Sequence, residues 1–374
     1  MNAVHIFPYS PFISGGHTNA IRAFINAQRL QGIEAVGMAT ITPKGCSYEK
    51  QPLGFPLEEV DAELDLTWRL IEERFGFTPQ KTVVHIHTVT TKLKPFLRDL
   101  QRRGIPYVLT SHGQLHFRSA VHWAKKFLYL NFFNLDIRKA AAIHFLTADA
   151  KQRGRWLLPG YAGECFVQPH ALDVPELSTL PPVFKSDYGI PDDAFLWLFL
   201  GRLDVHVKGL DLLVEAFSRL DSSRLWLAFA GPDWEGGKEQ LNELAERLQC
   251  RERLCFLGPV YGEKKWGVLK MADGFVTPSR WDAFPVAILE AMACALPVLT
   301  SSKMGPAKDF KEAGAARICP LDARRIASEM DHLAKNEAAR HSLAEQGRYW
   351  VETYCNPQQV GLRFQQIYSS LLGG

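Results

Sequence analysis

The sequence lacks the features that place a chain in a membrane or outside the cell. No stretch approaches the roughly 18 uninterrupted apolar residues that a membrane-spanning helix needs. The N-terminus has no basic region before an apolar core, so it predicts a first β-strand in a cytoplasmic protein. The seven cysteines are odd in number and include no Cys-x-x-Cys pair, which argues against a disulfide framework and a zinc site.

Low-complexity runs and internal repeats are also absent, which leaves an ordinary globular composition of 47% hydrophobic and 22% charged residues. The 374 residues exceed the usual size of one hydrophobic core, so two domains are expected. A proline-marked segment begins after residue 173 and is the expected boundary. The predicted division is 1–173, 174–355 and a C-terminal helix at 356–374 that packs back on the first domain.

Short apolar runs alternate with helical patterns in both halves of the chain. In the second half, apolar runs at 195–200, 225–229, 253–257, 274–277 and 298–301 are separated by helical stretches. This alternation is typical of parallel sheets that are covered by helices. The predicted fold class is therefore α/β, with two Rossmann-like doubly wound parallel sheets, one in each domain.

The most informative stretch runs from 277 to 300 and places two acids, Asp282 and Glu290, across a loop-to-helix junction. Pro285 is favoured in the first turn of a helix. The amides of Val286 and Ala287 would then form an anion site, because the first N–H groups of a helix have no partner inside it. The alternative for this stretch alone is an ordinary buried helix with an acid near its N-terminus.

A basic loop follows the first strand of the second half. Arg202 and Lys208 lie six residues apart in this glycine-bounded loop. Arginine can meet a diphosphate with its forked guanidinium group and lysine can meet it as a point charge. The turn that contains Val260 would line the same edge of the sheet with backbone. Since basic residues also occur on ordinary surface loops, a loop without function is the alternative.

The first half offers a glycine loop and a histidine. Gly15 and Gly16 follow the first strand, and glycine lets a ligand approach the backbone because it has no Cβ. His112 follows a later strand and is predicted to hydrogen-bond a substrate hydroxyl or to polarise a departing group. A capping or packing role is the alternative. His85 and His87 share one face of a strand, which indicates packing more than metal binding.

Positive charge is concentrated in the first half. Residues 1–173 carry 20 Lys or Arg against 14 Asp or Glu, whereas the remainder carries 23 against 26. The segment 81–155 holds 14 basic and three acidic residues, and 123–129 mixes cations with aromatic side chains. This mixture is typical of a helix that contacts an anionic membrane or a lipid-linked acceptor. A solvated basic face is the alternative, and no nucleic-acid-binding motif accompanies the charge.

Taken in order, the glycine pair, the histidine, the basic loop and the acid pair resemble the retaining glycosyltransferases of family 4, which have the GT-B fold. The resemblance covers nearly the whole chain. It is most specific at 282–298, where an acid, seven residues and a second acid lead into Ala-Met-Ala and Pro-Val. The resemblance implies two domains that face each other across a cleft, the first for the acceptor and the second for the nucleotide sugar.

The resemblance also implies roles for individual residues. Glu290 would hold the ribose hydroxyls, Asp282 the sugar hydroxyls, and the Val286 and Ala287 amides a phosphate. The implied catalytic residues are His112, Asp282, Arg202 and Lys208, and the implied donor contacts are Gly15, Gly16, Arg202, Lys208, Val260, Asp282, Phe284, Val286, Ala287 and Glu290. The chain contains no Asp-x-Asp motif, so neither a metal nor another cofactor is expected.

The implied activity is transfer of a sugar from a UDP- or GDP-sugar to a glycan or lipid-linked oligosaccharide in polysaccharide biosynthesis, with a peripheral contact to the inner face of the membrane. The alternatives are a catalytically degenerate nucleotide-sugar or glycan-binding protein and a GT-B-shaped nucleotide-sugar epimerase. The family usually has Glu-Gly where this chain has Asp282 and Ala283, and glycine where it has Ala295. Aspartate is one methylene group shorter than glutamate, which points to an altered sugar contact or an unusual donor.

Overall fold

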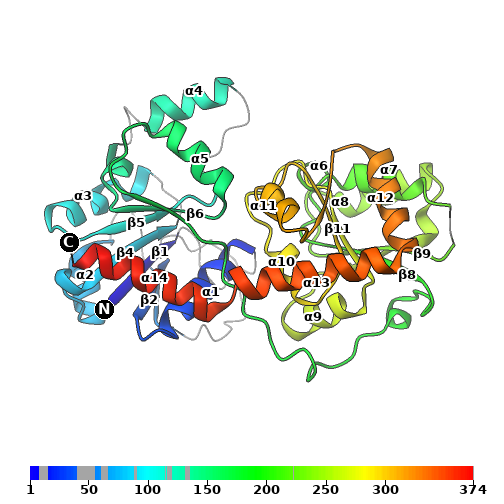
Figure 1. Ribbon diagram of the computed structural model, residues 1–374, viewed down its shortest axis with the longest axis horizontal. Helices are drawn as coiled ribbons and strands as arrows, with labels where there is room; N and C mark the ends of the chain where they lie inside the picture. Colours follow the sequence, from blue (N-terminus) through cyan, green and yellow to red (C-terminus); the bar gives the residue numbers. More distant parts are fainter. Residues whose placement is uncertain are drawn as a thin grey trace. The chain divides into compact units, whose positions relative to one another are not determined.

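The computed structural model describes residues 1–7, 16–39, 55–59, 66–87, 91–113, 115, 120–130, 135–221 and 223–373. The chain forms two compact units (Figure 1). Unit 1 comprises Met1–Asp173 and Tyr354–Gly374, and unit 2 comprises Val174–Thr353. The chain therefore leaves unit 1 once and returns to it with its last helix.

Unit 1 is built on a seven-stranded parallel sheet with the strand order β3-β2-β1-β4-β5-β6-β7. Its strands are β1 (Asn2–Phe7), β2 (Glu34–Ala39), β3 (Leu57–Glu59), β4 (Thr82–His87), β5 (Tyr107–Thr110), β6 (Ala142–Phe145) and β7 (Glu164–Val167). Its helices are α1 (Gly16–Arg29), α2 (Trp68–Phe75), α3 (Lys94–Arg102), α4 (Ala120–Leu128), α5 (Ala148–Leu157) and α14 (Pro357–Leu372).

The two faces of this sheet differ in chemistry. Val4 and Ile6 of β1 belong to a hydrophobic core that also contains residues of α2, α3 and α5. Successive strand residues point to opposite faces, so His5, His85 and His87 lie on the other face. There they pack against α1 and α14, which lie side by side (Figure 1). One interface of unit 1 is therefore filled with buried imidazole rings.

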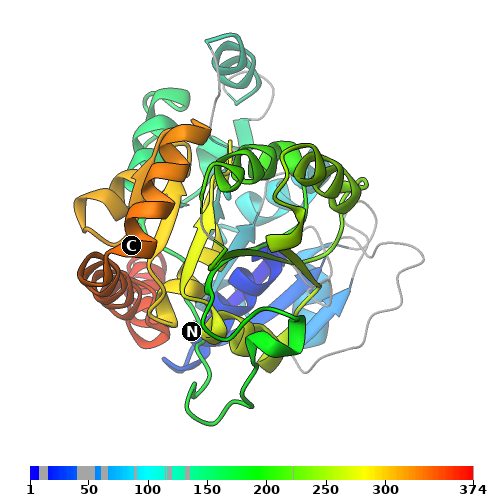
Figure 2. The same ribbon diagram turned by 90° about the vertical axis from the view of Figure 1, so that its right-hand side faces the viewer.

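Unit 2 is built on a six-stranded parallel sheet with the strand order β10-β9-β8-β11-β12-β13. Its strands are β8 (Phe195–Leu200), β9 (Leu225–Ala230), β10 (Leu254–Gly258), β11 (Gly274–Thr277), β12 (Val298–Ser301) and β13 (Arg317–Cys319). The helices that follow are α6 (Val205–Lys208), α7 (Leu210–Ser218), α8 (Gly237–Arg247), α9 (Gly262–Met271), α10 (Val286–Ala293), α11 (Ala307–Glu312), α12 (Ala323–Lys335) and α13 (Glu337–Tyr354). The strands and helices of this unit can be followed by colour in Figure 2, from green through yellow to orange.

The strand order of each sheet reverses direction once, between β1 and β4 in unit 1 and between β8 and β11 in unit 2. Such a reversal is called a topological switch point, and open α/β sheets bind ligands beside it, at the carboxyl ends of the strands. In unit 2 the two loops at this point are 201–209 and 278–285, which contain four of the ten residues predicted to bind a donor. The fold alone therefore marks these loops as a candidate site.

The predicted fold class is confirmed, because both sheets are parallel and doubly wound. The last helical region of unit 2 is divided into α12 and α13 at Asn336, whose side-chain oxygen accepts a hydrogen bond from the Ala339 amide at 2.9 Å. Within the described ranges, no helix is both long and apolar enough to cross a membrane. The cysteines that the structure describes are free thiols, and Cys46 lies outside the described residues.

Candidate functional site

The candidate site of unit 2 is formed by the loops that follow β8 and β11. In the first loop, α6 begins after Asp204 because this carboxylate accepts a hydrogen bond from the Val207 amide at 3.0 Å. The second loop leads from β11 into α10. Since β8 and β11 are neighbours, both loops leave the sheet at the same edge.

A lysine and an aspartate join the two loops. The Nζ atom of Lys208 lies 2.5 Å from Oδ2 of Asp282, with side-chain exposures of 20% and 19%. The structure thus brings together two predicted site residues that are 74 positions apart in the sequence. An anionic ligand at this edge would meet a lysine that is already ordered, so binding would cost less side-chain entropy.

Arg280 holds the second loop against the first. Its guanidinium group donates hydrogen bonds to both carboxylate oxygens of Asp211 at 2.7 and 2.6 Å, which is the strong bidentate geometry. It also donates to the His206 carbonyl oxygen at 2.8 Å, and the Arg280 amide donates to the Val207 carbonyl oxygen at 2.9 Å. These bonds fix the positions from which Lys208 and Asp282 meet.

Gly209 sets how closely the two loops approach each other. Its φ angle is +67°, and a Cβ atom at this position would overlap the carbonyl oxygen of Pro278. We expect Gly209→Ala to lower the free energy of unfolding by about 3–4 kcal/mol, because the left-handed backbone costs a side chain about 1–2 kcal/mol and the overlap adds to it. Equilibrium denaturation measures the loss.

Gly236→Ala is the matched control for this substitution. Gly236 has a φ angle of +73°, but no atom lies within 4 Å of the position its Cβ would take. It should lose only the backbone contribution of about 1–2 kcal/mol. Equal losses in the two variants would contradict the close approach of the loops.

The N-terminus of α10 lies at the same edge of the sheet. The helix begins at Val286, and no side chain caps it. Pro285 occupies the capping position, one residue earlier than the first helical turn in which it was expected. The amides of Val286 and Ala287 are therefore among the first N–H groups of the helix, which are suited to bind an anion.

Glu290 lies one turn further along α10 and is paired with a lysine of α9. Its Oε1 atom lies 2.5 Å from Nζ of Lys265, and the side-chain exposures of the lysine and the glutamate are 16% and 8%. The buried carboxylate is thus neutralised and held in one orientation. Burial, strengthened by the charge of Glu290, raises the pKa of the neighbouring Cys294 to about 12, so this cysteine remains a neutral thiol.

The other predicted donor residues of unit 2 have different surroundings. The guanidinium group of Arg202 lies 4.3 Å from the centre of the Trp234 ring, a cation–π contact that keeps the cation ordered. The side chains of Val260 and Phe284 are buried, and Phe284 meets the edge of Phe310. A ligand would therefore meet these two residues mainly through their backbone.

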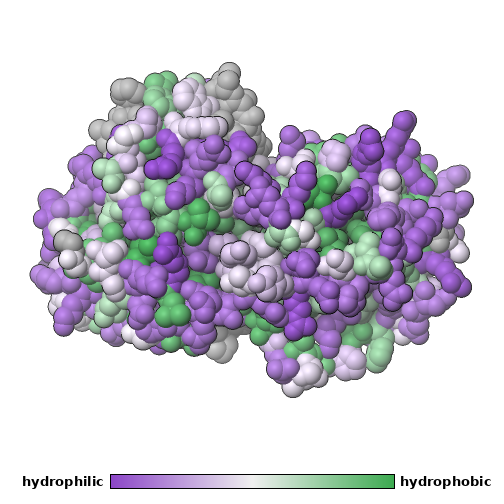
Figure 3. All heavy atoms as spheres, viewed as in Figure 1, coloured by the Kyte–Doolittle hydropathy of each residue, from purple (hydrophilic) through white to green (hydrophobic). Residues whose placement is uncertain are grey.

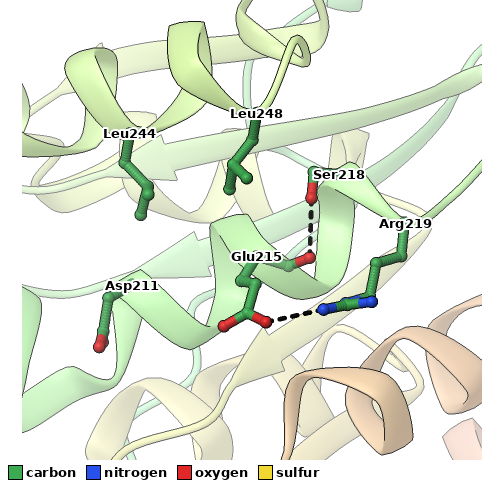
Figure 4. A pocket seen from close by; sticks show the side chains of 6 residues that line it. All are labelled: Asp211, Glu215, Ser218, Arg219, Leu244 and Leu248. Atoms are coloured by element: carbon green, nitrogen blue, oxygen red, sulfur yellow. Dashed lines mark hydrogen bonds and ion pairs between the residues drawn. The ribbon is translucent and has the colours of Figure 1, made fainter.

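A surface pocket of about 420 Å³ lies between α7 and α8 (Figure 4). It is lined by Asp211, Glu215, Ser218, Arg219, Leu244 and Leu248. Glu215 accepts a hydrogen bond from Arg219 at 2.8 Å, and Asp211 is engaged by Arg280. Because it lies between two helices and not at the carboxyl ends of the strands, where open α/β sheets bind ligands, this pocket is a weaker candidate than the loops at the switch point.

Two further predicted site residues, His112 and Gly16, lie in unit 1. His112 directly follows Ser111 after β5, in a left-handed backbone conformation with φ of 37° that side chains seldom adopt. Its Nε2 atom lies 2.9 Å from Nδ1 of His87, and its ring stacks on that of His170. Gly16 is the first residue of α1, whereas Gly15 lies outside the described residues.

Three buried histidines of unit 1 could hold a metal ion. One ring nitrogen from each of His5, His85 and His87 lies within 4.8 Å of the others, and imidazole is a common zinc ligand. However, both nitrogens of His5 and both nitrogens of His85 already take part in hydrogen bonds inside the protein. A metal ion would have to displace these bonds, so the arrangement fits a hydrogen-bond network better than a metal centre.

Sequence reasoning missed Lys265, Asp211 and Arg280. Lys265 is one of two consecutive lysines at the start of α9, where a basic pair is unremarkable. Asp211 and Arg280 are 69 positions apart, so no spacing rule connects them. Together with the predicted residues, they give a site with ordered cations, a free helix N-terminus and two oriented carboxylates. Such a site can bind a diphosphate that carries hydroxylated groups at both ends.

The comparison with known families agrees with this chemistry. Residues 182–350 match the family described as glycosyl transferases group 1. The lipopolysaccharide core biosynthesis glycosyltransferase LpsD of Rhizobium meliloti is 29% identical over 174 residues, which cover 46% of this chain and 49% of the relative. This chain spans about half the length of the curated relatives it matches.

Solved structures match over the whole chain. Sucrose-phosphate synthase from Thermosynechococcus elongatus has a TM-score of 0.78 and 18% identity, covering 100% of this chain and 99% of the other. Anabaena HepE in complex with UDP and glucose has a TM-score of 0.75 and 14% identity, covering 99% of this chain and 100% of the other. At this identity the likeness concerns the fold, and it supports the GT-B class predicted from the sequence.

Proposed function

We propose that this chain, whose residues 182–350 match the glycosyl transferases group 1 family, moves a sugar from a UDP- or GDP-sugar to a glycan or lipid-linked acceptor with retention of anomeric configuration. The observation that carries the proposal is the pair of Lys208 and Asp282 at the switch point of unit 2. It places a cation suited to a diphosphate beside a carboxylate suited to sugar hydroxyls. The complex of HepE with UDP and glucose supports the donor class.

The proposed mechanism follows from where charge develops. Breaking the bond between the anomeric carbon and its oxygen leaves negative charge on the departing diphosphate. Arg202, Lys208 and the N-terminus of α10 are already ordered near one sheet edge and would stabilise this charge, which lowers the barrier. Glu290 would hold the ribose hydroxyls and Asp282 those of the transferred sugar. In this proposal no step is assigned to a metal ion.

The two units have separate roles in the proposal. Unit 2 would bind the nucleotide sugar through the contacts described above, and unit 1 would bind the acceptor. His112 and the glycine loop at Gly15 and Gly16 would act from unit 1. A cytoplasmic location belongs to the same proposal. So does a role in polysaccharide biosynthesis, which the name of the relative in lipopolysaccharide core biosynthesis supports.

A panel of UDP, GDP and ADP sugars tests the function. A ligand present at 100 times its dissociation constant adds about 2.7 kcal/mol to the stability of the folded state, which raises the melting temperature. We expect a UDP- or GDP-sugar to raise it and to release free UDP or GDP in the presence of acceptor. Binding without turnover would favour a degenerate binding protein, and a rearranged nucleotide sugar from donor alone would favour an epimerase.

We also propose that α4 and α5 contact an anionic membrane or the lipid part of an acceptor. Leu128, Tyr129 and Trp156 expose 52%, 38% and 56% of their surface in and beside these helices. Lys125 and Lys126 lie in the last turn of α4. Figure 3 shows hydrophobic side chains among hydrophilic ones on this part of unit 1. Large exposed apolar groups beside cations are suited to a lipid interface.

Reversing two charges tests the membrane contact. We expect Lys125→Glu with Lys126→Glu to lower recovery with anionic vesicles in a flotation assay by at least about tenfold, since each lysine near an anionic surface contributes about 1 kcal/mol. Lys308→Glu with Lys311→Glu makes the same charge change on α11 and should leave recovery unchanged. Equal recovery of the unchanged protein with neutral and anionic vesicles would contradict the contact.

A further inference from the structure

A continuous chain of hydrogen bonds crosses the interior of unit 1 and ends at His112. From His112 it passes to His87 at 2.9 Å, to His5 at 2.9 Å and to Gln28 at 2.9 Å. From Gln28 it continues to Tyr368 at 3.2 Å, His85 at 2.6 Å, Thr110 at 2.5 Å, His144 at 2.8 Å and the carbonyl oxygen of Gln168 at 2.7 Å. All members between the two ends are fully buried.

The direction of the hydrogen-bond chain, from donor to acceptor, is fixed at the end formed by Gln168. The Gln168 carbonyl oxygen can only accept, so His144 must donate to it from Nε2. A neutral imidazole has one donor and one acceptor nitrogen, so Nδ1 of His144 accepts from the Thr110 hydroxyl. That hydroxyl then accepts from Nε2 of His85, whose Nδ1 accepts from the Tyr368 hydroxyl.

The same rule carries the direction through to His112. The Tyr368 oxygen accepts from the Gln28 amide nitrogen, and the Gln28 amide oxygen accepts from Nε2 of His5. Nδ1 of His5 then accepts from Nε2 of His87, and Nδ1 of a neutral His87 ring accepts from Nε2 of His112. Every donor in the chain meets an acceptor in this direction. In the opposite direction, the Gln168 carbonyl oxygen would lie beside an imidazole nitrogen that carries no proton.

Burial favours the neutral imidazoles on which this order depends. Desolvation lowers the pKa of His5 and the pKa of His144 to about 4. It also lowers the pKa of His85 well below the ordinary value, with further lowering by His5 and His144. At neutral pH these three rings each carry a single ring proton, so each can donate only once.

We infer that this chain fixes the tautomer of His112, with the proton on Nε2 and with Nδ1 as its acceptor nitrogen. His87, His5, Gln28 and Tyr368 are then positioning residues, since they act through His112. The tautomer stands on the geometry of unit 1, and its use rests on the proposed function. In that function Nδ1 is a nitrogen that accepts a hydrogen bond, so His112 does not donate a proton to the departing group.

A pair of His87 variants tests the inference. In donor-free protein with ¹⁵N-labelled histidine, we expect the resonances of His112, identified with a His112→Asn variant, to show a proton on Nε2 and none on Nδ1. His87→Leu removes the acceptor and should give a mixture of tautomers. His87→Gln can accept through its oxygen and donate through its nitrogen, so it should restore the single tautomer.

Kinetics with the donor give a second readout. We expect His87→Leu to lower kcat about tenfold with little change in KM, and His87→Gln to stay within about threefold of the unchanged protein. Thr82→Val removes a buried hydroxyl from the same strand outside the chain and should change neither the tautomer nor kcat. If His87→Leu does not fold, Tyr368→Phe interrupts the chain at constant shape and should also give mixed tautomers.

Two results would overturn the inference. One is a proton on Nδ1 of His112 in the unchanged, donor-free protein. The other is a single Nε2 tautomer and an unchanged kcat in the folded His87→Leu or Tyr368→Phe variant. If the unchanged protein keeps the Nε2 tautomer but transfers no sugar from any donor, the proposed function fails and the assignment of the tautomer stands.

Discussion

Replacing Lys208 by methionine is expected to slow sugar transfer by about 10²–10³-fold in a protein that still folds. Removal of one preordered group that stabilises charge in a transition state typically costs this much. Lys208 is ordered by Asp282 at the sheet edge where the diphosphate is proposed to leave. Methionine keeps much of the length of the side chain and removes its charge. Initial rates at saturating donor measure the loss, and the melting temperature confirms the fold.

A second substitution separates two roles of the same lysine. If Lys208 served only to neutralise Asp282, combining Lys208→Met with Asp282→Leu would restore the affinity for free UDP or GDP, which lacks the sugar that Asp282 is proposed to hold, because no unpaired carboxylate would remain. If Lys208 binds the diphosphate, the double variant binds the free nucleotide as weakly as the single one. A normal rate in the folded Lys208→Met variant would remove the basis of the proposed mechanism.

Glu290→Leu is expected both to destabilise the protein and to abolish nucleotide binding. The substitution leaves Lys265, which is 16% exposed, without its carboxylate partner. Removing one partner of a buried ion pair costs about 3–5 kcal/mol of stability. The ribose hydroxyls would also lose their proposed acceptor. Denaturant unfolding measures the first effect, and calorimetric titration with UDP and with GDP measures the second.

The two effects of Glu290 can be separated by removing its partner as well. Combining Glu290→Leu with Lys265→Met leaves no buried charge, so most of the lost stability should return. Nucleotide binding should not return, because the ribose contact is still missing. Recovery of both properties in the double variant would mean that Glu290 has only a structural role.

Much of the fold could be predicted because it depends on local patterns. The alternation of apolar runs with helical stretches predicted parallel sheets, and β8, β9, β11 and β12 lie within a residue or two of the expected ranges. The site could be predicted as far as the carboxyl ends of strands define it. Arg202, Lys208, Asp282 and Glu290 all follow strands of one sheet, and the strand order places the loops after β8 and β11 together.

What could not be predicted are contacts set by the packing of distant segments. The pairing of Lys265 with Glu290 depends on how α9 lies against α10, and the sequence contains no period that encodes it. Arg280 and Asp211 meet for the same kind of reason. The strand pattern that predicted packing for His85 and His87 contained no sign of Tyr368, which is about 280 positions away in α14.

One position where this chain differs from the usual residue of the family 4 glycosyltransferases has a physical consequence in the structure. Ala295, where the family usually has glycine, adopts a left-handed backbone with φ of 54°, a conformation that glycine takes without strain. The chain therefore keeps the backbone path that glycine would favour and carries a side chain on it. Asp282, the other departure, still reaches Lys208, so the shorter acid is joined to the predicted cation.

Hydrogen exchange with and without nucleotide tests the central claim most directly, namely that the loops at the switch point of unit 2 bind the diphosphate. The probe is whichever of UDP and GDP raises the melting temperature more. We predict that it slows exchange of backbone amides at 202–209 and 284–290, which include the N-terminus of α10. Unchanged exchange in both segments at saturating nucleotide, with slowing confined to unit 1 or to the pocket between α7 and α8, would contradict the claim.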